Sequence, residues 1–543
     1  MIPLSFQPSG ITCEAEKGAL LLDVARRAGV RVESACAGRG ICKSCIIRLE
    51  GVVPPPSAAD LERFNDDELG AGWRRACQTR IEGPLTVHVP AKSYAANIAL
   101  GQDGGDAQIV IEDPIARATD EPGFWQIGSE VLGPLDGPPL AMAVDLGTTN
   151  IAAALIDMTS GVLLKTGAAT NPQSAFGADV ISRLGAAHAT EDNKSTLRDA
   201  VMDAIARLAQ KMTGGKTESI ALVALAGNTA MQHLAMDWPI DSLLSAPYEP
   251  AITAPFDGRA ADMGLTFAKG ALLYVAPSIA GFVGGDHVTS LYETMLSTRA
   301  TCWAMLDIGT NTEIGLFKDG KLTSVSCASG PAFEGGKLSC GMRAAPGAVE
   351  AVKIVDQTVS LKVIRDKDPV GICGSGVVSV MANLMRAGLV NHRGRLQPRK
   401  PVECEGRQRE LVLWRDPTQK ALPVLFTQDD VRNVQVAKAA IRAGLDCLLS
   451  HRDLADEDIQ CLVIAGAFGR YIDIDEAVQI GLFPDLPRDR ILQVGNAAAA
   501  GIRRLSVCNK ARSEAHDLAR SVLYLELASD PRFQRAFILR SKL

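Results

Sequence analysis

Apolar and polar positions alternate in blocks along this chain, and one block pattern occurs twice. Residues 143–156 (AVDLGTTNIAAALI) and residues 305–319 (MLDIGTNTEIGLFKD) each contain an apolar run, an Asp-x-Gly-Thr turn and a second apolar run. Two apolar runs joined by a tight polar turn predict a β-hairpin whose turn exposes backbone N–H groups and hydroxyls. Such turns bind anions, and a neighbouring aspartate can hold Mg²⁺ through water. Two matched copies predict a duplicated domain that closes on one nucleotide from both sides.

Strand and helix patterns alternate through the rest of the region that begins near residue 141. Periodicity predicts a helix over 194–211, and a second over 428–450 that Thr427 and Asp430 would cap. An Ala-rich helix is expected within 495–505, and AGNTAM (226–231) is expected to be a loop. Buried strands are expected at 219–225, at 272–275 and at the start of 462–473. This alternation is typical of α/β folds.

The first 92 residues form a separate pattern of short strands around one helix. An acidic segment, 60–69, predicts a solvated helix. The other expected elements are strands at Ile2–Phe6, Ile11–Ala15 and Leu85–Val89, and a helix with Leu20, Leu21, Val24 and Ala28 on one face that ends at Gly29.

Four cysteines in this N-terminal module have the spacing of an iron–sulfur site. Cys36, Cys42 and Cys45 follow the pattern C-x5-C-x2-C, and Cys77 follows at a distance. Three thiolates on a Gly-rich loop plus one from a distant segment hold a 2Fe-2S cluster in ferredoxins. The alternative is a structural zinc site, which usually has two C-x2-C pairs, whereas this module has one. The module resembles the 2Fe-2S ferredoxin fold, and its first gap of five residues is closer to the adrenodoxin-like variant.

Composition narrows the class of protein. The 543 residues are 47% hydrophobic with a net charge of −6 and no basic block, so nucleic acid is not an expected partner. The N-terminus lacks the pattern of a signal peptide, and no apolar run approaches the roughly 18 residues of a membrane span. We therefore expect a cytoplasmic protein. The 13 cysteines do not form a disulfide framework, and Cys327, Cys340 and Cys373 are expected to be buried thiols rather than ligands of a second cluster.

Residues 93–140 connect the two patterned regions. They contain GQDGGD, several prolines and little periodicity, apart from one expected strand at Gln108–Ile111. We interpret them as a linker that lets the iron–sulfur module move.

The motifs of the whole chain resemble those of a known family. The doubled hairpins and the late Ala-Gly-Ala-Phe-Gly turn resemble the actin, sugar kinase and Hsp70 ATPase superfamily. The whole chain resembles the reductive activators of corrinoid proteins. The resemblance rests on the iron–sulfur module and on the motifs that follow it in order: AGNTAM, PYEPA, FVGGD, DIGTNTE, GPAFEGG, ICGSG and AGAFGRYID. The resemblance implies a multidomain α+β and α/β fold. Its parts would be a β-grasp 2Fe-2S ferredoxin domain (1–92), a linker (93–140) and a two-lobed actin-like ATPase domain of duplicated ribonuclease H-like units (141–300 and 301–543).

The same resemblance implies three nucleotide-binding segments, with ATP and Mg²⁺ as ligands. They are Asp145, Gly147, Thr148 and Thr149 as the first phosphate loop, Asp307, Gly309, Thr310 and Asn311 as the second, and Gly466, Ala467, Phe468 and Gly469 against the adenosine.

Two features depart from the usual pattern of this family. The connection is too short for the separate middle domain of some members, which is associated with dimerisation, so a homodimer is left open. The adenosine turn reads Gly-Ala-Phe-Gly where Gly-Gly-Phe-Gly is common. The methyl group of Ala467 would then lie where the backbone approaches the nucleotide, which implies a lower affinity.

The implied function is ATP-dependent reductive activation. One electron from an external donor would pass through the cluster to Co(II) of a corrinoid protein and restore Co(I) for methyl transfer. A plant-type cluster has a potential of about −400 mV, and the Co(II)/Co(I) couple is more negative while the lower axial ligand is bound. We expect ATP to change the shape of the two lobes, so that this ligand is removed or replaced.

Four residues are candidates for catalysis. Asp286 is a candidate to position attacking water, or it caps a turn. Glu313 lies beside the second phosphate loop, or it is an ordinary hairpin residue. Ser329 and Ser375 are candidates to bring a hydroxyl near cobalt, or both belong to turns that close the nucleotide site.

Two rival functions stay open from sequence. One is a small-molecule kinase whose cluster is a redox sensor, and the other is an ATP-gated, chaperone-like binding protein with a structural cluster. A visible spectrum and an ATPase assay with and without a corrinoid protein would separate the three. The sequence does not identify the corrinoid protein, the methyl donor or the reductant.

Overall fold

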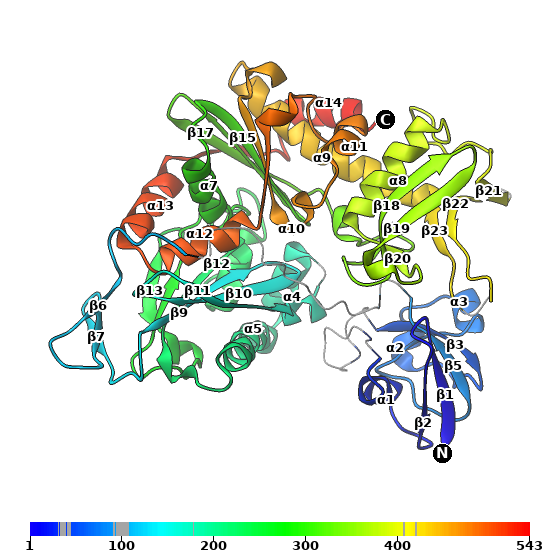
Figure 1. Cartoon of the computed structure of the whole chain (residues 1–543), viewed down its shortest axis with the longest axis horizontal. Helices are drawn as coiled ribbons and strands as arrows, with labels where there is room; N and C mark the ends of the chain where they lie inside the picture. Colours follow the sequence, from blue (N-terminus) through cyan, green and yellow to red (C-terminus); the bar gives the residue numbers. More distant parts are fainter. Residues whose placement is uncertain are drawn as a thin grey trace.

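The computed structural model describes residues 1–30, 32, 40, 45–90, 93, 108–177, 179–405, 408–418 and 421–543, without the side chains of residues 405, 408 and 467. Figure 1 shows a small domain near the N-terminus and a larger region, which contains two six-stranded sheets and several smaller ones. We call the sheet that contains β9 and its helices the first lobe, and the sheet that contains β15 and its helices the second lobe.

The N-terminal domain is a five-stranded sheet in the order β2-β1-β5-β3-β4. β1 (Ile2–Gln7) pairs antiparallel with β2 (Ile11–Ala15) and parallel with β5 (Leu85–His88). β3 (Ile46–Gly51) completes the centre of the sheet, and α1 (Leu21–Arg27) packs its apolar face into the same core. The strands and the helix predicted for this module are confirmed, and together they form the predicted β-grasp arrangement.

The acidic segment 60–69 is not one solvated helix, so that prediction is wrong. It lies in two short helices, α2 (Ala58–Leu61) and α3 (Asp66–Gly70), each closed by a capping box. The side chain of Asp60 is buried, and its Oδ1 accepts a hydrogen bond of 2.8 Å from the backbone N–H of Arg75 on β4 (Trp73–Arg75). Charge density alone does not reveal a carboxylate that is tied to a distant strand.

Residues 108–140 differ from the predicted linker. Gln108 makes an isolated bridge to Val162 instead of starting a strand over 108–111. An antiparallel sheet of three short strands follows: β6 (Ala116–Ala118), β7 (Trp125–Ile127) and β8 (Glu130–Leu132). Apolar side chains of this segment belong to a core shared with both lobes, so the predicted hinge does not extend over these residues.

The first lobe is a six-stranded sheet in the order β11-β10-β9-β12-β14-β13. Every position of β12 is buried, as its uninterrupted apolar run predicts. The predicted loop 226–231 is partly wrong, because Asn228 caps a helix that begins at Thr229. The elements of this lobe are β9 (Leu140–Leu146), β10 (Asn150–Asp157), β11 (Leu163–Thr170), α4 (Val180–Ala189), α5 (Glu191–Thr213), β12 (Ile220–Gly227), α6 (Thr229–Ala235), β13 (Phe256–Arg259) and β14 (Leu272–Val275).

The second lobe repeats this topology. Its sheet has the order β25-β24-β15-β16-β17-β26. The strands β17-β16-β15-β24-β25 therefore correspond to β11-β10-β9-β12-β14 of the first lobe, where β13 precedes β14 in the chain and lies at the edge of the sheet. The capping box of α9 at Thr427 and Asp430 is confirmed. The predicted duplication is therefore present in the fold. The elements are β15 (Cys302–Ile308), β16 (Thr312–Lys318), β17 (Lys321–Cys327), α9 (Gln428–His451), β24 (Cys461–Ala465), α10 (Gly466–Gly469), β25 (Ile491–Gly495), β26 (Leu523–Tyr524) and α14 (Pro531–Arg540).

An insertion in the second lobe lies above the N-terminal domain in Figure 1. A cavity of about 270 Å³ separates Trp73 and His88 of the N-terminal domain from Val370, Pro423 and Leu425 of the insertion. The insertion contains β18 (Ala348–Val355), β19 (Thr358–Val363), β20 (Gly371–Ile372), α8 (Gly374–Arg386), β21 (Val402–Glu405), β22 (Gln408–Trp414) and β23 (Val424–Thr427).

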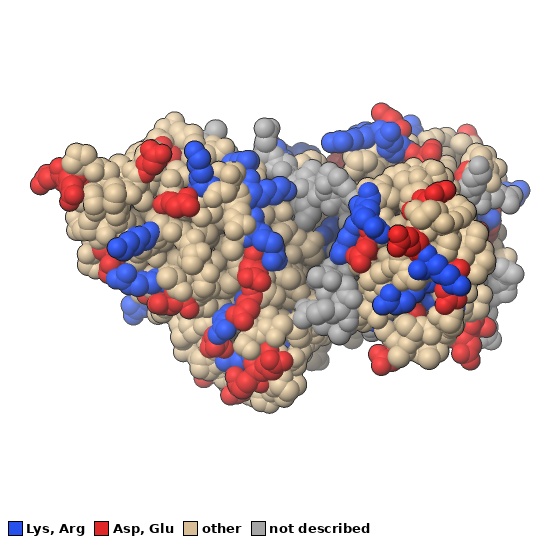
Figure 2. Space-filling model, turned by 90° about the horizontal axis from the view of Figure 1, so that it is seen from below, with Lys and Arg blue, Asp and Glu red and all other residues tan. Residues whose placement is uncertain are grey.

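Three further helices lie where the lobes meet: α7 (Gly285–Ser297), α12 (Ala497–Leu505) and α13 (Asn509–Ser521). They contribute to an apolar core that also contains residues from the central strands of both sheets. Across the described residues, none of the helices combines the length and apolar character needed to cross a membrane. On the face drawn in Figure 2, basic and acidic side chains are interspersed.

Candidate functional site

Both predicted hairpins form, and their turns lie at corresponding ends of the two sheets. β9 and β10 pair up to Leu146 opposite Ile151, and β15 and β16 pair up to Ile308 opposite Thr312. The structure places the predicted phosphate-loop residues at these turns: Asp145, Gly147, Thr148 and Thr149 in the first lobe, and Asp307, Gly309, Thr310 and Asn311 in the second.

Four carboxylates from different elements gather between the two turns. Asp145 and Asp307 occupy matching positions near the ends of β9 and β15, and Glu313 lies opposite Asp307 on β16. Asp286 is in the first turn of α7. Asp145 and Asp307 both act electrostatically on Asp286, and Asp286 and Asp307 act on Glu313, so the four groups form one cluster. Sequence reasoning had named all four without showing that they meet.

The protonation of this cluster is strongly perturbed. Burial raises the pKa of Asp145 to about 6, against the hydrogen bond from Asn496 that lowers it. Burial, followed by the charge of Asp145, raises the pKa of Asp286 to about 8. Burial also raises the pKa of Asp307 and Glu313. The charges that raise these pKa values come from the other carboxylates of the cluster. Among the described residues no three such groups are placed to bind a metal ion directly, so a divalent cation such as Mg²⁺ would be held at these aspartates through water.

Each turn is held by hydrogen bonds from the segment that follows the third strand of its lobe, and we call these two segments clamps. In the first lobe, Asn171 Nδ2 donates to Gly147 O (2.9 Å) and the Asn171 N–H donates to Thr149 O (2.9 Å). In the second lobe, Ser329 Oγ donates to Gly309 O (3.2 Å). The N–H of the next residue, Gly330, donates to Thr310 O (2.9 Å). The clamps occupy equivalent places, and both clamp side chains are buried.

The hydroxyl of Ser329 is therefore engaged in supporting a turn. It also shares a hydrogen bond of 2.8 Å with Thr312 Oγ1. Ser375 lies in the first turn of α8, where its Oγ is 3.5 Å from Cys373 Sγ. Both placements favour the alternative that these serines belong to turns closing the nucleotide site. A role near cobalt stays a prediction for either residue.

The second turn has two additional polar neighbours that sequence reasoning missed. Thr310 Oγ1 donates a hydrogen bond to Glu334. Burial raises the pKa of Glu334, and the Thr310 hydrogen bond and the charge of Arg343 offset only part of that rise. Arg343 also reaches the first lobe, where its Nη1 donates to Thr170 Oγ1 at 3.5 Å. This guanidinium is thus a cation between the two turns.

The predicted adenosine turn lies beside the second phosphate turn. Gly466 has φ +87°, and a Cβ there would lie 2.7 Å from Ile308 O and 3.0 Å from Asp307 Oδ1, so only glycine fits. The Phe468 ring stacks on Phe333 with 5.1 Å between centroids. Gly469 ends the same short helix. The side chain of Ala467 lies outside the described structure, and its expected effect on affinity stays a prediction.

Two of the four predicted cluster ligands are described, and they lie together. Cys45 precedes β3 and Cys77 follows β4, and the backbone N–H of Ala76 donates to Cys45 O at 2.9 Å. Both cysteines are buried, and Gln78 Nε2 is 3.7 Å from Cys77 Sγ. Cys36 and Cys42 lie outside the described residues. The β3–β4 pairing brings the distant ligand beside the loop ligand, which fits the chemistry of a 2Fe-2S site.

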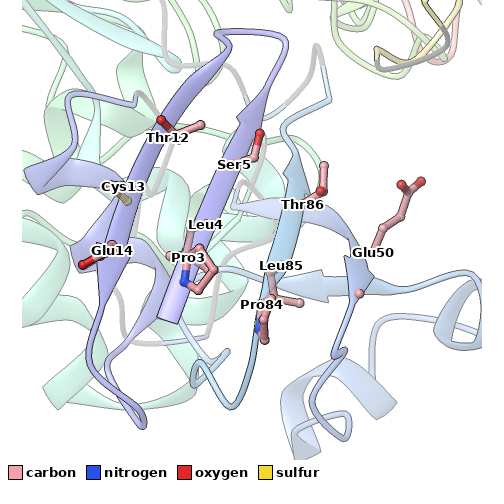
Figure 3. Close-up of a pocket in the computed structure, with 11 residues that line it drawn as sticks. Pro3, Leu4, Ser5, Thr12, Cys13, Glu14, Glu50, Pro84, Leu85 and Thr86 are labelled. Atoms are coloured by element: carbon pink, nitrogen blue, oxygen red, sulfur yellow. The ribbon is translucent and has the colours of Figure 1, made fainter. Parts of the chain in front are cut away.

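A shallow hollow of about 680 Å³ lies away from both of these sites, on the outer face of the N-terminal sheet. Figure 3 shows Thr12, Ser5 and Thr86 side by side across three strands, and the register places Glu50 next in the same row. The hollow shares no residue with the acid cluster and contains neither Cys45 nor Cys77. Cys13 is half-buried and lines this hollow.

The other cysteines near Gly loops match the buried-thiol prediction in part. Cys327 and Cys373 are buried, and burial raises the pKa of both thiols. Cys340 is half-buried, and its Sγ lies 3.6 Å from Pro423 O. Within the portion of the chain that is described, no group of three or more candidate ligands is placed to hold a metal.

Three family models match consecutive parts of the chain. Residues 4–82 match a 2Fe-2S iron–sulfur cluster binding domain, residues 140–299 match the RACo middle region, and residues 301–543 match the C-terminal domain of RACo, the ASKHA domain. The RACo middle region therefore coincides with the segment that contains the first-lobe sheet. The fold class expected from the sequence is confirmed.

Individual relatives agree with these domain matches. The corrinoid activation enzyme RamQ of Eubacterium limosum is 27% identical, over 97% of each chain. The Co(II) methylated amine-specific corrinoid protein reductase of Methanosarcina barkeri is 24% identical, over 73% of this chain and 76% of its own. A solved structure of a reductive activator for a corrinoid iron–sulfur protein superimposes with a TM-score of 0.72 at 27% identity, over 100% of this chain and 98% of that one.

Proposed function

Because the chain belongs to the family of reductive activators of corrinoid proteins, we propose that it reduces Co(II) of a partner corrinoid protein to Co(I) and uses ATP to do so. Each turnover would take one electron from an external low-potential reductant and deliver it to cobalt, with no net change in the redox state of the chain. The methyltransferase system served by that partner would then regain its active form.

One observation carries the proposal of ATP use: carboxylates from both halves of a duplicated fold meet between two matched turns. Asp145 and Asp307 come from equivalent strands, and the charge of Asp307 raises the pKa of Asp145, so the two turns lie near one another. A triphosphate brought into this acidic region would need a bound cation, and Mg²⁺ would supply the charge neutralisation. We assign phosphate contacts to the two turns and cation contacts to the aspartates.

Asp286 and Glu313 are the groups we assign to positioning water at the transferred phosphate. The charges of Asp145 and Asp307 raise the pKa of Asp286, and those of Asp286 and Asp307 raise the pKa of Glu313; neither Asp286 nor Glu313 carries a described salt bridge. The pKa of Asp286, near 8, allows this carboxyl to exchange a proton at neutral pH. Arg343 is placed to balance the developing negative charge from the side of Glu334.

The N-terminal domain is the part that we assign to electron transfer. Cys45 and Cys77 are buried next to one another, and Gln78 supplies a nearby N–H donor. A bound 2Fe-2S cluster would supply a one-electron carrier with a potential near about −400 mV. The protein would shield that carrier from solvent and orient it toward the partner.

ATP is needed in this proposal because the electron moves uphill. Every 59 mV or so of unfavourable potential costs a factor of ten in the one-electron equilibrium. A nucleotide can help only if it binds two shapes of the protein with different affinity. We propose that the nucleotide-bound shape of the lobes grips the corrinoid protein so that cobalt loses its lower axial ligand, which raises its potential.

The test is an anaerobic assay with purified, cluster-loaded protein, a low-potential reductant and a Co(II) corrinoid protein. We expect Co(I) absorbance to rise only when ATP and Mg²⁺ are present. Cys77→Ser should remove the visible colour and the Co(I) signal while binding of an ATP analogue remains. Asp145→Asn should keep the colour and lose the ATP-dependent signal.

The outcomes separate this function from its rivals. A phosphorylated small molecule formed at a rate indifferent to the corrinoid protein would favour a kinase. Full activity of Cys77→Ser would favour an ATP-gated binding protein with a structural cluster. Either result would contradict the proposed function. A cytoplasmic location stays part of the proposal.

A further inference from the structure

A buried arginine lies beside the two described cysteines of the predicted iron–sulfur site. Arg75 is the last residue of β4, and it pairs with Ile46, which directly follows Cys45. Cys77 comes two positions after Arg75 in the chain. Only 4% of Arg75 is exposed, and its Nε has no hydrogen-bond partner among the described residues. The fold therefore keeps a positive charge close to two thiolate ligands and away from bulk water.

The side chain of Arg75 also reaches the segment that contains the other two predicted ligands. We call residues 36–45 the cysteine segment. Nη1 of Arg75 donates a hydrogen bond to the carbonyl oxygen of Gly40, which lies between Cys36 and Cys42 in the sequence. The backbone of Arg75 is itself fixed, because its N–H donates to Oδ1 of the buried Asp60 at 2.8 Å. One residue thus connects the cysteine segment to β4 and to α2.

Gln78 makes the second polar contact at this site. Its Nε2 donates toward Cys77 Sγ at 3.7 Å, so an amide N–H is directed at a ligand sulfur. The same amide lies against Gly40, where a Cβ would be 2.8 Å from Nε2 and 2.9 Å from Cδ of Gln78. Gly40 has φ +77°, a conformation that favours glycine. The cysteine segment therefore offers bare backbone at the point that Arg75 and Gln78 both contact.

We propose that Arg75 and Gln78 raise the reduction potential of the 2Fe-2S cluster, so that the chain is more easily reduced by its electron donor. The cluster gains one negative charge when it takes up an electron. A nearby cation and an N–H donor to a ligand sulfur both stabilise that added charge. This inference rests on the proposed electron-transfer role of the N-terminal domain, which it extends by naming the residues that tune the carrier.

The consequence concerns which step of the proposed reaction is uphill. A higher cluster potential makes reduction of the cluster easier and leaves a larger gap to the Co(II)/Co(I) couple. Arg75 and Gln78 thus move the energetic cost from loading of the cluster to transfer to cobalt, the step that the proposed use of ATP supports. One electron enters the cluster and one leaves it, and neither step forms or breaks a bond at the cluster.

The test is a redox titration of the full, cluster-loaded chain. Dithionite is added in the presence of redox mediators, and the EPR signal of the reduced cluster gives its midpoint potential. Gln78→Met removes the N–H donor, Arg75→Gln removes the charge, and Arg75→Lys retains the charge. Arg74→Gln is the matched control: Arg74 is the neighbouring buried arginine of β4, and its guanidinium bonds Pro54 O and Leu69 O instead.

The expected result is a change in potential that follows the charge and the donor. Gln78→Met and Arg75→Gln should each lower the equilibrium constant for cluster reduction about tenfold, which corresponds to a midpoint about 59 mV more negative. Arg75→Lys should stay within about threefold of wild type, because lysine keeps the charge on a side chain of different shape. Arg74→Gln removes an equal charge on the other face of the strand, and its midpoint should match that of wild type.

An unchanged midpoint in Gln78→Met and in Arg75→Gln would overturn the inference, and so would an equal shift in Arg74→Gln. If Arg75→Gln holds no cluster, Gln78→Met and Arg75→Lys decide: a tenfold effect in the first and not in the second supports the inference, and any other pattern overturns it. A reconstituted wild type without the EPR signal of a reduced cluster would contradict the proposed function. A normal wild-type signal with unshifted variants would contradict the inference alone.

Discussion

The two lobes contain the same hairpin, but the threonine hydroxyls of the two turns differ in their hydrogen bonds. In the second lobe, Thr310 Oγ1 already donates to Glu334, and Thr312 bonds Ser329. In the first lobe, no described residue takes a hydrogen bond from Thr148 or Thr149. The hydroxyls of the first turn are thus available to an anion, whereas the Thr310 hydroxyl of the second turn is already bonded to Glu334. Duplication preserved the scaffold of the site and let the chemistry of its two sides diverge.

The clamps of the two turns diverge as well. Asn171 makes both contacts of the first clamp by itself, through its side chain and its N–H. In the second lobe Ser329 donates to the equivalent glycine carbonyl, and a second residue, Gly330, donates to Thr310 O, one position earlier in the turn than the counterpart of Thr149. An amide and a hydroxyl fill one structural role, because both can donate to the carbonyl oxygen of the turn glycine.

The largest expected effect tests the aspartate that each lobe has at the same position of its hairpin. Asp145→Asn and Asp307→Asn should each lower kcat for Mg²⁺-dependent ATP hydrolysis about a hundredfold, since each removes one of the charges that hold the cation. Steady-state kinetics with varied Mg²⁺ measure this, with Asp319→Asn in an exposed turn as control. If one variant stayed within threefold of wild type, that lobe would not serve the nucleotide.

The second prediction concerns the clamps. Asn171→Ala should lower the free energy of unfolding by about 2 kcal/mol and Ser329→Ala by about 1 kcal/mol, because each leaves a turn carbonyl without its donor. The amide is fully buried and has more contacts to lose. Chemical denaturation measures both values. A larger loss for Ser329→Ala would reverse the ranking.

The third prediction concerns the pH dependence of stability that arises from the cluster of carboxylates, to which both lobes contribute residues. The folded state holds a proton on Asp286 up to about pH 8, whereas the unfolded chain releases it near the ordinary pKa of 3.8. The folded state therefore binds more protons between these values, and its stability falls as pH rises. Without Mg²⁺, Asp286→Asn should lose about 1–2 kcal/mol less than wild type between pH 6 and pH 8, after allowance for solvent screening. Urea titrations at the two pH values measure this, and equal slopes would contradict it.

The smallest effect tests the difference between the turns. Thr148→Ala should weaken binding of an ATP analogue about tenfold, and Thr310→Ala about threefold, because the Thr310 hydroxyl must first leave Glu334. Isothermal titration gives both constants. Equal losses would mean that the Thr310–Glu334 bond does not restrict the second turn.

Local pattern was sufficient for much of this fold. The hairpins, the buried strand β12, the capping box of α9 and the strands of the N-terminal domain were all predicted, because each depends on residues a few positions apart. The cysteine spacing predicted the iron–sulfur module in the same way, and the residues 4–82 that match such a domain agree. Errors arose where a short segment is held by a distant one, as at Asp60 and in residues 108–140.

The sequence by itself determined the kind of chemistry: thiolates at ligand spacing, and two acidic turns in a duplicated pattern. Tertiary structure alone decided how these groups meet. Asn496 donates a hydrogen bond to Asp145 across 351 positions, Ser290 donates one to Asp307 across 17, and neither contact has a local signature. Periodicity and spacing report short-range geometry, whereas these contacts depend on how α7 and α12 pack between the two sheets, which no short stretch of sequence encodes.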